Sequence, residues 1–415
     1  MPGTKNIIQD LEARGLIADK TADLARIFSE PRTVYWGIDP TADSLHVGHL
    51  VPLLMMKRLG LAGHTLIFLV GGATGMIGDP KEKGERSLLE EEVVEGNVRA
   101  IKKQVRTLIG TLPFRLVNNI AWLSRASLIP FLRDVGKYFT VNELIKRETI
   151  RRRLETPDES ISYTEFTYAL LQGYDYFVLN KKYNCTLQIG ASDQWTNILS
   201  GVELIRRRAG KEVFGLTVPL VTDAAGKKFG KSEGNAVWLD ARKTSPFAFY
   251  QFWLNQPDSV LGSYLRLYTF LSSKEIDALL EMHHANPAKH RAQQVLAHTV
   301  TEIAHGASAA ASAEAAAEAL FGRAPLSSLS RSARAALQAE APHILVRKRT
   351  TIMDTLLKGG FASSKSDARR LIAGGAVFLN GIQVGEDRVF GKDDFTDGLA
   401  LLKKGKHDVL LLVLK

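Results

Sequence analysis

Hydrophobic and polar positions divide the chain into stretches of different character. As far as about residue 30, apolar residues recur at helical spacing, which predicts short amphipathic helices with a buried face formed by Leu11, Leu16, Leu24 and Ile27. Between residues 33 and 221, short apolar runs bounded by turn residues alternate with longer helical patterns. The short runs predict strands at 33–38, 65–70, 114–117 and 186–190, and the longer patterns predict helices at 50–59, 88–108 and 161–178.

Alternation of strands and helices is typical of an α/β fold, here a Rossmann-like parallel sheet with helices on its faces. Ligands of such folds bind at the carboxyl ends of the strands. From Ser245 to about Phe321 the pattern is helical and ends in an alanine-rich helix at 304–319. Residues 322–342 are rich in turn formers and predict a linker, and a compact mixed pattern follows.

These changes of pattern predict four segments: a catalytic domain at 1–225, a lysine loop with an α-helical domain at 226–322, a linker at 323–344, and a small α+β domain at 345–415. A chain of 415 residues is long enough for several such domains. No apolar run reaches the ~18 residues of a membrane span, and the first ten residues lack the layout of a secretory signal.

Composition and charge add less than the pattern does. Hydrophobic residues make up 45% and charged residues 24%, as in a globular protein. Cys185 is the only cysteine, which excludes an intramolecular disulfide and a cysteine-built zinc site and fits a reducing cytoplasm. The net charge of +10, from 54 basic and 44 acidic residues, is compatible with a polyanionic partner but does not by itself establish one.

A pair of histidines follows the first predicted strand. After Gly37, Asp39 and a proline, the chain reads His46-Val-Gly-His49 where a helix is expected to begin. Unpaired N–H groups at a helix start suit a phosphate, and two histidines three positions apart can donate hydrogen bonds to phosphate oxygens as negative charge develops. The alternatives are a surface His-x-x-His without a catalytic role and half of a metal site, and the metal site lacks a third ligand of clear spacing.

A basic motif at 226–235 places Lys228, Lys231 and Ser232 among three glycines. Such a loop can close over a triphosphate and place positive charge on departing pyrophosphate. The segment almost fits a Walker phosphate loop, but it has three residues between the glycines where four are required, and a strand-like run follows it. A charged, solvated hairpin is the alternative for this segment taken alone.

Together the two motifs resemble the HIGH and KMSKS signatures of class I aminoacyl-tRNA synthetases. The resemblance extends to the bacterial tyrosyl-tRNA synthetases through further segments in matching order, at 35–46, 70–80, 168–175 and 188–195. Order and spacing match across nearly the whole chain. A tryptophanyl enzyme is the alternative within the class, and Tyr35 with Asp175 speaks against it.

The resemblance implies a role for each matching position. Those for tyrosine are Tyr35 and Asp175 at the phenol, Asp79, Tyr168 and Gln172 at the ammonium group, and Gln194 at the carboxylate. Those for ATP are Gly37, Asp39, His49 and Asp193 at the nucleotide and Thr41 and His46 at the γ-phosphate. The pyrophosphate would meet Lys228, Lys231 and Ser232, assisted by a second basic segment with Lys83 and Arg86.

The residue types agree with these roles. A buried tyrosine–aspartate pair favours a ligand that carries a hydroxyl, because phenylalanine would leave both groups unsatisfied. The alternative is that Asp79 and Asp175 are ordinary helix-capping or turn residues with no role in ligand binding. The sequence departs from the family pattern at Trp36 and Ala191, where smaller residues are common, and carries Pro52 one turn beyond His49.

The last segment is basic and carries its own signals. Arg347, Lys348 and Arg349 precede a predicted helix that begins at Ser364 with Asp367 in a capping box and carries Lys365, Arg369 and Arg370. A strand at 376–379 and the hairpin turn Asn380-Gly381 follow. This pattern resembles a small RNA-binding module shared with a ribosomal protein, whose cations would contact phosphates. The alternative is a solvated basic helix on a structural domain.

The resemblance therefore implies a cytoplasmic tyrosine–tRNA ligase that uses ATP with Mg2+ as a substrate complex and needs no structural metal. Its partners would be tyrosine, ATP, tRNA(Tyr) and a second copy of the chain, in contact near residues 129–151, and no membrane. The alternative from another class is an RNA-binding protein that has lost catalysis, against which the intact histidines and lysines argue.

Overall fold

The computed structural model of the chain describes residues 4–81, 84, 88–222, 236–321, 324–405 and 408–415. Its packing divides the chain into two compact units, Met1–Asp240 with Pro257–Ala278 and Ala241–Gln256 with Leu279–Lys415. This division by packing differs from the four functional segments, which stay a prediction. Among the described residues, no helix is long and apolar enough to cross a membrane.

A parallel sheet forms the centre of the first unit, as the sequence predicted, and it has a fifth strand besides the four that were predicted. The strand order is β3-β2-β1-β4-β5. The strands are β1 (Thr33–Ile38), β2 (Thr65–Val70), β3 (Phe114–Asn118), β4 (Leu187–Ala191) and β5 (Phe214–Val218). The first two match their predicted bounds, and the next two differ from theirs by one residue.

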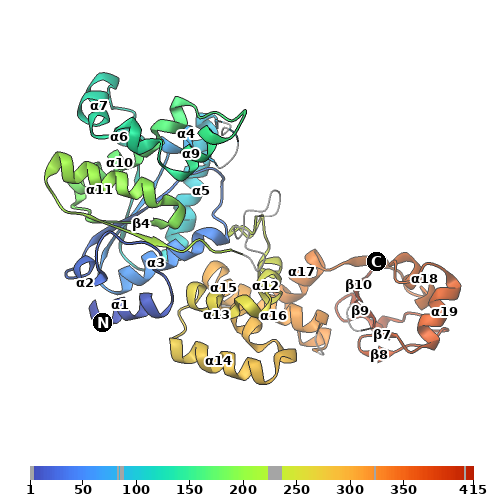
Figure 1. Cartoon of the computed structure of the whole chain (residues 1–415). Coiled ribbons are helices and arrows are strands. Elements are labelled where there is room, and N and C mark those ends of the chain that lie inside the picture. The colour runs from blue at the N-terminus through green and yellow to red at the C-terminus, as the bar shows by residue number, and fades with distance from the viewer. Residues whose placement is uncertain (1–3, 82–83, 85–87, 223–235, 322–323, 406–407) are drawn as a thin grey trace. The chain divides into compact units, whose positions relative to one another are not determined.

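The first unit also contains helices, several of which lie beside the sheet (Figure 1). They are α1 (Thr4–Ala13), α2 (Leu24–Ile27), α3 (Leu50–Leu61), α4 (Thr74–Ile77), α5 (Glu91–Ile109), α6 (Ile120–Leu123), α7 (Leu128–Asp134), α8 (Val141–Leu144), α9 (Glu148–Glu155), α10 (Tyr163–Tyr183), α11 (Trp195–Ala209) and α13 (Asp258–Tyr268). Helix α10 runs five residues beyond the predicted end at 178 and stops where Asn184 adopts a left-handed conformation with φ 51°.

Both faces of the sheet are covered. Tyr35 and Ile67 belong to a core shared with Tyr176 of α10 and Ile205 of α11, and the neighbouring strand residues point to the opposite face because side chains alternate. Burial on both faces explains why the strands read as continuous apolar runs. The order of the strands reverses between β1 and β4, and the crevice at the carboxyl ends of these two strands is where such folds bind ligands.

The second unit contains a helical part. Its helices are α12 (Pro246–Leu254), α15 (Arg291–His305), α16 (Ala307–Phe321) and α17 (Arg331–Glu340), and α14 (Ser273–Ala285) spans the boundary between the units. The single alanine-rich helix predicted at 304–319 is instead the end of α15 and the whole of α16. Gly306, with φ 88°, ends α15 because this backbone conformation cannot continue a helix.

The expected linker is more ordered than predicted. It contains a 3-10 turn, η5 (Leu326–Ser328), and helix α17. Ser330 caps this helix, since its hydroxyl accepts a hydrogen bond from the Ala333 N–H (3.1 Å). Leu326, Ala333 and Leu337 are buried. The apolar spacing of these residues outweighs the turn formers between them.

The C-terminal part of the second unit is a mixed sheet of order β6-β10-β9-β7-β8 with two helices. Its elements are β6 (His343–Val346), α18 (Ile352–Lys358), α19 (Lys365–Ala373), β7 (Val377–Leu379), β8 (Ile382–Gln383), β9 (Leu399–Lys404) and β10 (Asp408–Leu414). Asn380 and Gly381 have φ of 49° and 83° and join β7 to β8, which confirms the predicted hairpin turn.

Candidate active site

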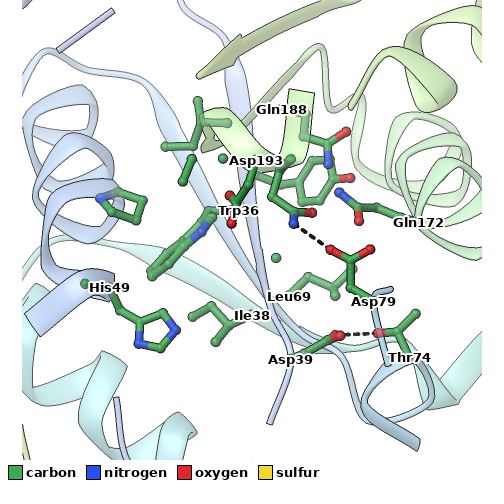
Figure 2. A pocket seen from close by; sticks show the side chains of 18 of the residues that line it. Trp36, Ile38, Asp39, His49, Leu69, Thr74, Asp79, Gln172, Gln188 and Asp193 are labelled. Atoms are coloured by element: carbon green, nitrogen blue, oxygen red, sulfur yellow. Dashed lines mark hydrogen bonds between the residues drawn. The ribbon is translucent and has the colours of Figure 1, made fainter. Parts of the chain in front are cut away.

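One pocket of about 230 Å3 opens at the carboxyl ends of β1 and β4. Among the residues that line it are all the predicted site residues of the first unit that the structure describes: Tyr35, Gly37, Asp39, Thr41, His46, His49, Asp79, Tyr168, Gln172, Asp175, Asp193 and Gln194. Figure 2 shows several of these side chains around the cavity. Lys83, Arg86, Lys228, Lys231 and Ser232 lie outside the described residues.

The buried end of the pocket is built around Asp175. Helix α10 presents Tyr168, Gln172 and Asp175 at spacings of four and three, so all three lie on one face of the helix. Asp175 is 2% exposed, and its two carboxylate oxygens accept hydrogen bonds from Trp122 Nε1 (2.7 Å) and Asn119 Nδ2 (2.9 Å). Burial raises the pKa of Asp175 to about 7, against the lowering effect of these two donors.

Tyr35 provides a hydroxyl at the same end of the pocket. Its ring packs at 5.2 Å from that of Tyr176, and its pKa is raised well above the usual value by burial and then by the charge of Asp175. The hydroxyl therefore stays protonated. It is buried and has no hydrogen-bond partner among the described residues. A buried hydroxyl without a partner costs roughly 1–3 kcal/mol, so this atom suits a polar group of a ligand.

A second carboxylate, Asp79, lies among amide side chains. Its oxygens accept from Gln194 Nε2 (2.8 Å) and Asn197 Nδ2 (3.2 Å), and Figure 2 marks the first of these bonds. Arg147 donates to Asn197 Oδ1 (2.8 Å), and burial lowers the pKa of Arg147 to about 10 while Asp79 opposes this shift. A carboxylate held in this way can accept hydrogen bonds from an ammonium group.

A third carboxylate, Asp39, follows β1. Its Oδ2 atom accepts from the Tyr168 hydroxyl (2.7 Å) and its Oδ1 atom from the Thr74 hydroxyl (2.7 Å). Burial, followed by the charge of Asp39, raises the pKa of Tyr168 well above its usual value, so that hydroxyl remains a donor. These two hydrogen bonds hold the Asp39 carboxylate at the wall of the pocket.

The two histidines lie directly before α3, where His46 caps the 3-10 turn η1 (Val47–His49). His46 Nδ1 accepts from the Gly48 N–H (3.0 Å), and His49 Nδ1 accepts from the His46 N–H (3.2 Å). Their ring centres are 4.0 Å apart. Since both Nδ1 atoms accept, each neutral ring carries its proton on Nε2. This tautomer makes each Nε2 a donor of the kind that a phosphate oxygen requires.

Both ends of the segment that contains the lysine motif are anchored at the pocket. Leu220 and Val221 line the pocket, and the Thr222 carbonyl accepts from the Tyr264 hydroxyl (2.9 Å). Beyond the motif, the Val237 carbonyl accepts from the N–H of Val47 (3.0 Å), and the Leu239 N–H donates to the Leu45 carbonyl (2.8 Å). Residues 220–222 before the motif thus lie at the pocket, and residues 237–239 after it lie beside the segment that carries the histidines.

The three departures from the family pattern all line the pocket. Trp36 is 4% exposed, and its ring packs edge-on against Phe68 at 6.1 Å and lies 6.5 Å from the ring of His49. Figure 2 shows the indole between His49 and Asp193. Pro52 lies in the first turn of α3, where a missing N–H costs no helix hydrogen bond. Ala191 ends β4.

Sequence reasoning missed several polar residues that hold the predicted ones in place: Thr74, Asn119, Trp122, Arg147 and Asn197. Asn119 follows the carboxyl end of β3 directly, which is a signal that could have pointed to it. Arg147 is distant in sequence from its partners and carries no such signal. Among the residues that the structure describes, no cluster of His, Cys, Asp and Glu could hold a metal ion.

The predicted RNA-binding residues lie in the C-terminal part of the second unit. Arg347, Lys348 and Arg349 are exposed after β6. Lys365, Arg369 and Arg370 are exposed on α19, where Arg369 pairs with Glu386 (2.6 Å) and Arg370 with Asp367 (2.7 Å). The Ser364 hydroxyl caps this helix by accepting from the Asp367 N–H (3.2 Å), which confirms the predicted start.

Comparison with known proteins identifies the class. The family model of class I tRNA synthetases (W and Y) matches residues 29–322, and that of the tyrosine–tRNA ligase SYY-like C-terminal domain matches residues 333–412. Fold, pocket and family model together define a class I tRNA synthetase, as the sequence predicted.

Individual relatives narrow the class. The chain is 45% identical over 415 residues to tyrosine–tRNA ligase 1 of Vibrio parahaemolyticus and 46% identical over 426 residues to the tyrosine–tRNA ligase of Laribacter hongkongensis, covering 99% of both chains in each comparison. The crystal structure of a C-terminally truncated mitochondrial tyrosyl-tRNA synthetase of Aspergillus nidulans superposes with a TM-score of 0.68 at 32% identity, over 74% of this chain and 92% of the other. The chain belongs to the tyrosine–tRNA ligases of this family.

Proposed function

We propose that the pocket activates tyrosine with ATP and then passes the tyrosyl group to the 3′ end of tRNA(Tyr). In the first step a tyrosine carboxylate oxygen attacks the α-phosphorus of ATP, and the bond to pyrophosphate breaks. In the second, a terminal hydroxyl of the tRNA takes the tyrosyl group and AMP leaves. No side chain of the chain becomes covalently attached to substrate, so orientation and charge stabilisation supply the catalysis.

The tyrosine phenol would bind between Tyr35 and Asp175. The observation that carries this assignment is the pairing of a buried, unpartnered hydroxyl with a buried carboxylate at one end of the pocket. The phenol would donate to Asp175 and accept from Tyr35, which satisfies the hydroxyl that otherwise lacks a partner. The ammonium group would meet Asp79, Tyr168 and Gln172, and Gln194 would face the carboxylate.

ATP, supplied with Mg2+ as its substrate complex, would occupy the other end of the pocket. Gly37, Asp39, His49 and Asp193 would contact the nucleotide, with Asp193 on the ribose, and Thr41 and His46 would donate toward the γ-phosphate. Lys228, Lys231 and Ser232, with Lys83 and Arg86, would neutralise the departing pyrophosphate. The anchoring of residues 222 and 237 beside the pocket supports the part assigned to the lysines.

Exchange of labelled pyrophosphate into ATP tests this function, with tyrosine, phenylalanine and tryptophan as separate amino acids. We expect exchange with tyrosine and at least a thousandfold less with the other two, because neither satisfies both Tyr35 and Asp175. Exchange with tryptophan would instead favour the tryptophanyl enzyme. Absence of exchange with all three would refute the function and favour an RNA-binding protein without catalysis.

The partners of this function are part of the proposal. The exposed cations at 347–349 and on α19 support binding of tRNA phosphates by the C-terminal segment. A homodimer is supported by exposed apolar side chains on α7 to α9, within the region predicted for contact between copies. We also place the enzyme in the cytoplasm, where its product would serve protein synthesis, and keep the four functional segments as its domains.

A further inference from the structure

A continuous path of hydrogen bonds joins two carboxylates of the pocket, Asp39 and Asp175. The Thr74 hydroxyl donates to Asp39 Oδ1 (2.7 Å) and accepts from Asn119 Nδ2 (2.9 Å). The same amide nitrogen also donates to Asp175 Oδ2 (2.9 Å). Two side chains therefore connect the carboxylate proposed for the phenol with the one proposed for the nucleotide.

Asn119 is held in a single orientation. It is fully buried, and its Oδ1 atom accepts a hydrogen bond from the Ala73 N–H (2.8 Å). Its amide nitrogen donates to Thr74 and Asp175. Each hydrogen-bonding group of this amide is thus used, and rotation of the amide plane would break all three bonds. An asparagine needed only for packing would not have to direct its N–H groups toward site residues.

A glycine after β2, Gly71, leaves room for this path. A Cβ atom on Gly71 would lie 2.1 Å from Asp39 Oδ1 and 2.3 Å from Thr74 Oγ1, the two atoms of one hydrogen bond. Gly71, directly after β2, therefore permits the backbone to approach the Asp39 and Thr74 side chains.

We propose that Thr74 and Asn119 are positioning residues that join the tyrosine end of the pocket to its nucleotide end, an inference that rests on the proposed function. A phenol bound to Asp175 restrains that carboxylate, and through Asn119 and Thr74 it restrains Asp39. Along the path from amide to hydroxyl to carboxylate the donors point the same way, so each bond strengthens the next. Binding of the phenol therefore raises the rate constant of adenylate formation and does not only strengthen tyrosine binding.

Thr74→Val removes the hydroxyl and keeps the shape of the side chain, while Thr74→Ser keeps the hydroxyl. Rapid-quench measurement of tyrosyl-adenylate formation in the full-length chain gives the rate constant and the Kd of each substrate. We expect Thr74→Val to lower the rate constant roughly tenfold or more, as loss of a hydrogen bond to a charged group implies, with the Kd for tyrosine changed less than threefold. Thr74→Ser should remain within threefold of the unmodified chain in both quantities.

A double-mutant cycle separates this role from a loss of stability. Trp122→Phe removes the other donor to Asp175, so its effect on the rate constant and that of Thr74→Val should combine to less than their product. Trp253→Phe, at a buried position of the second unit, is the control. In the double variant of Trp253→Phe and Thr74→Val, the fold-change of the rate constant should equal the product of the two single fold-changes. If Thr74→Val does not fold, Gly71→Ala tests the same path by forcing Asp39 and Thr74 apart.

A rate constant for Thr74→Val within twofold of the unmodified chain would overturn the inference, as would equal losses in the Val and Ser variants. If Gly71→Ala is the variant used, a rate constant within twofold would overturn it likewise. Effects of Thr74→Val and Trp122→Phe that simply multiply would also overturn it. Absence of tyrosyl-adenylate from the unmodified chain would overturn the proposed function, whereas normal rates in the variants would overturn only the inference about Thr74 and Asn119.

Discussion

Asp175 illustrates how a single residue can be costly to the fold and useful to the site. Its carboxylate is buried, and desolvation raises its pKa from 3.8 to about 7 even though two side chains donate to it. Between these two pH values the folded chain binds a proton that the unfolded chain has lost. Protonation therefore stabilises the folded state, and this contribution falls as the pH rises toward 7.

The change Asp175→Asn tests this dependence. In the unmodified chain, the free energy of unfolding should rise relative to that of the Asn variant by up to about 1.4 kcal/mol for each unit that the pH falls below 7, until the unfolded carboxylate is protonated near pH 4. Urea unfolding of both chains at pH 7.5, 6.5 and 5.5 measures the difference. A difference that stays constant over this range would show that Asp175 titrates well below pH 5.

At this scale the sequence predicted the residues that carry distinctive chemistry. His46, Asp79 and Asp175 lie in recognisable motifs, and the structure brings them to one pocket. The sequence could not predict the contacts of Arg147 or Trp122, because these join residues 50 and 53 positions apart and depend on the packed fold. The roles of the lysines stay a prediction, since Lys228 and Lys231 lie outside the described residues.

At the scale of elements, the position of α10 decides the geometry of the pocket, since this helix carries Tyr168, Gln172 and Asp175. Helix α10 packs closely on α11 where the latter has Gly201. A Cβ atom at Gly201 would lie 2.8 Å from Tyr176 Cδ1 and 2.9 Å from Tyr176 Cβ. The glycine thus sets the distance between the two helices.

Gly201→Ala should therefore disturb both stability and substrate binding. We expect it to lower the free energy of unfolding by about 1–3 kcal/mol, as overpacking does, and to raise the KM for tyrosine in pyrophosphate exchange severalfold. Gly96→Ala in helix α5 is the matched control, because its Cβ atom would meet nothing closer than 3.9 Å. Since alanine favours helix more than glycine does, this variant should raise the free energy of unfolding by about 0.5–1 kcal/mol. Equal stability of the two variants would show that α10 and α11 adjust without cost.

The boundaries of strands were predictable where the pattern was strong, and those of helices less so. β1 and β2 are short apolar runs bounded by turn residues, and their predicted ends were correct. The helix predicted at 304–319 was wrong as a single element, because alanine favours helix throughout and hides the break at Gly306. Composition likewise hid α17, whose buried Leu337 became evident only in the fold.

At the scale of the whole molecule, apolar exposure on the first unit remains to be explained. Leu128 and Ile129 of α7 are 69% and 71% exposed, Val141 of α8 is 61% exposed and Leu154 of α9 is 54% exposed. Large apolar side chains this exposed on three consecutive helices favour contact with another protein surface. A second copy of the chain is the partner proposed, because a two-fold interface needs only one self-complementary patch.

Replacement of both Leu128 and Ile129 by Asp tests this assembly. Sedimentation equilibrium should give twice the chain mass for the unmodified protein at micromolar concentration and the single mass for the variant, since charges placed in an apolar interface lose their hydration without gaining partners. Leu61→Asp, at a half-exposed position at the end of α3, is the control and should leave the mass doubled. A monomeric unmodified chain would refute the homodimer. A variant that remains dimeric would place the contact between copies away from Leu128 and Ile129.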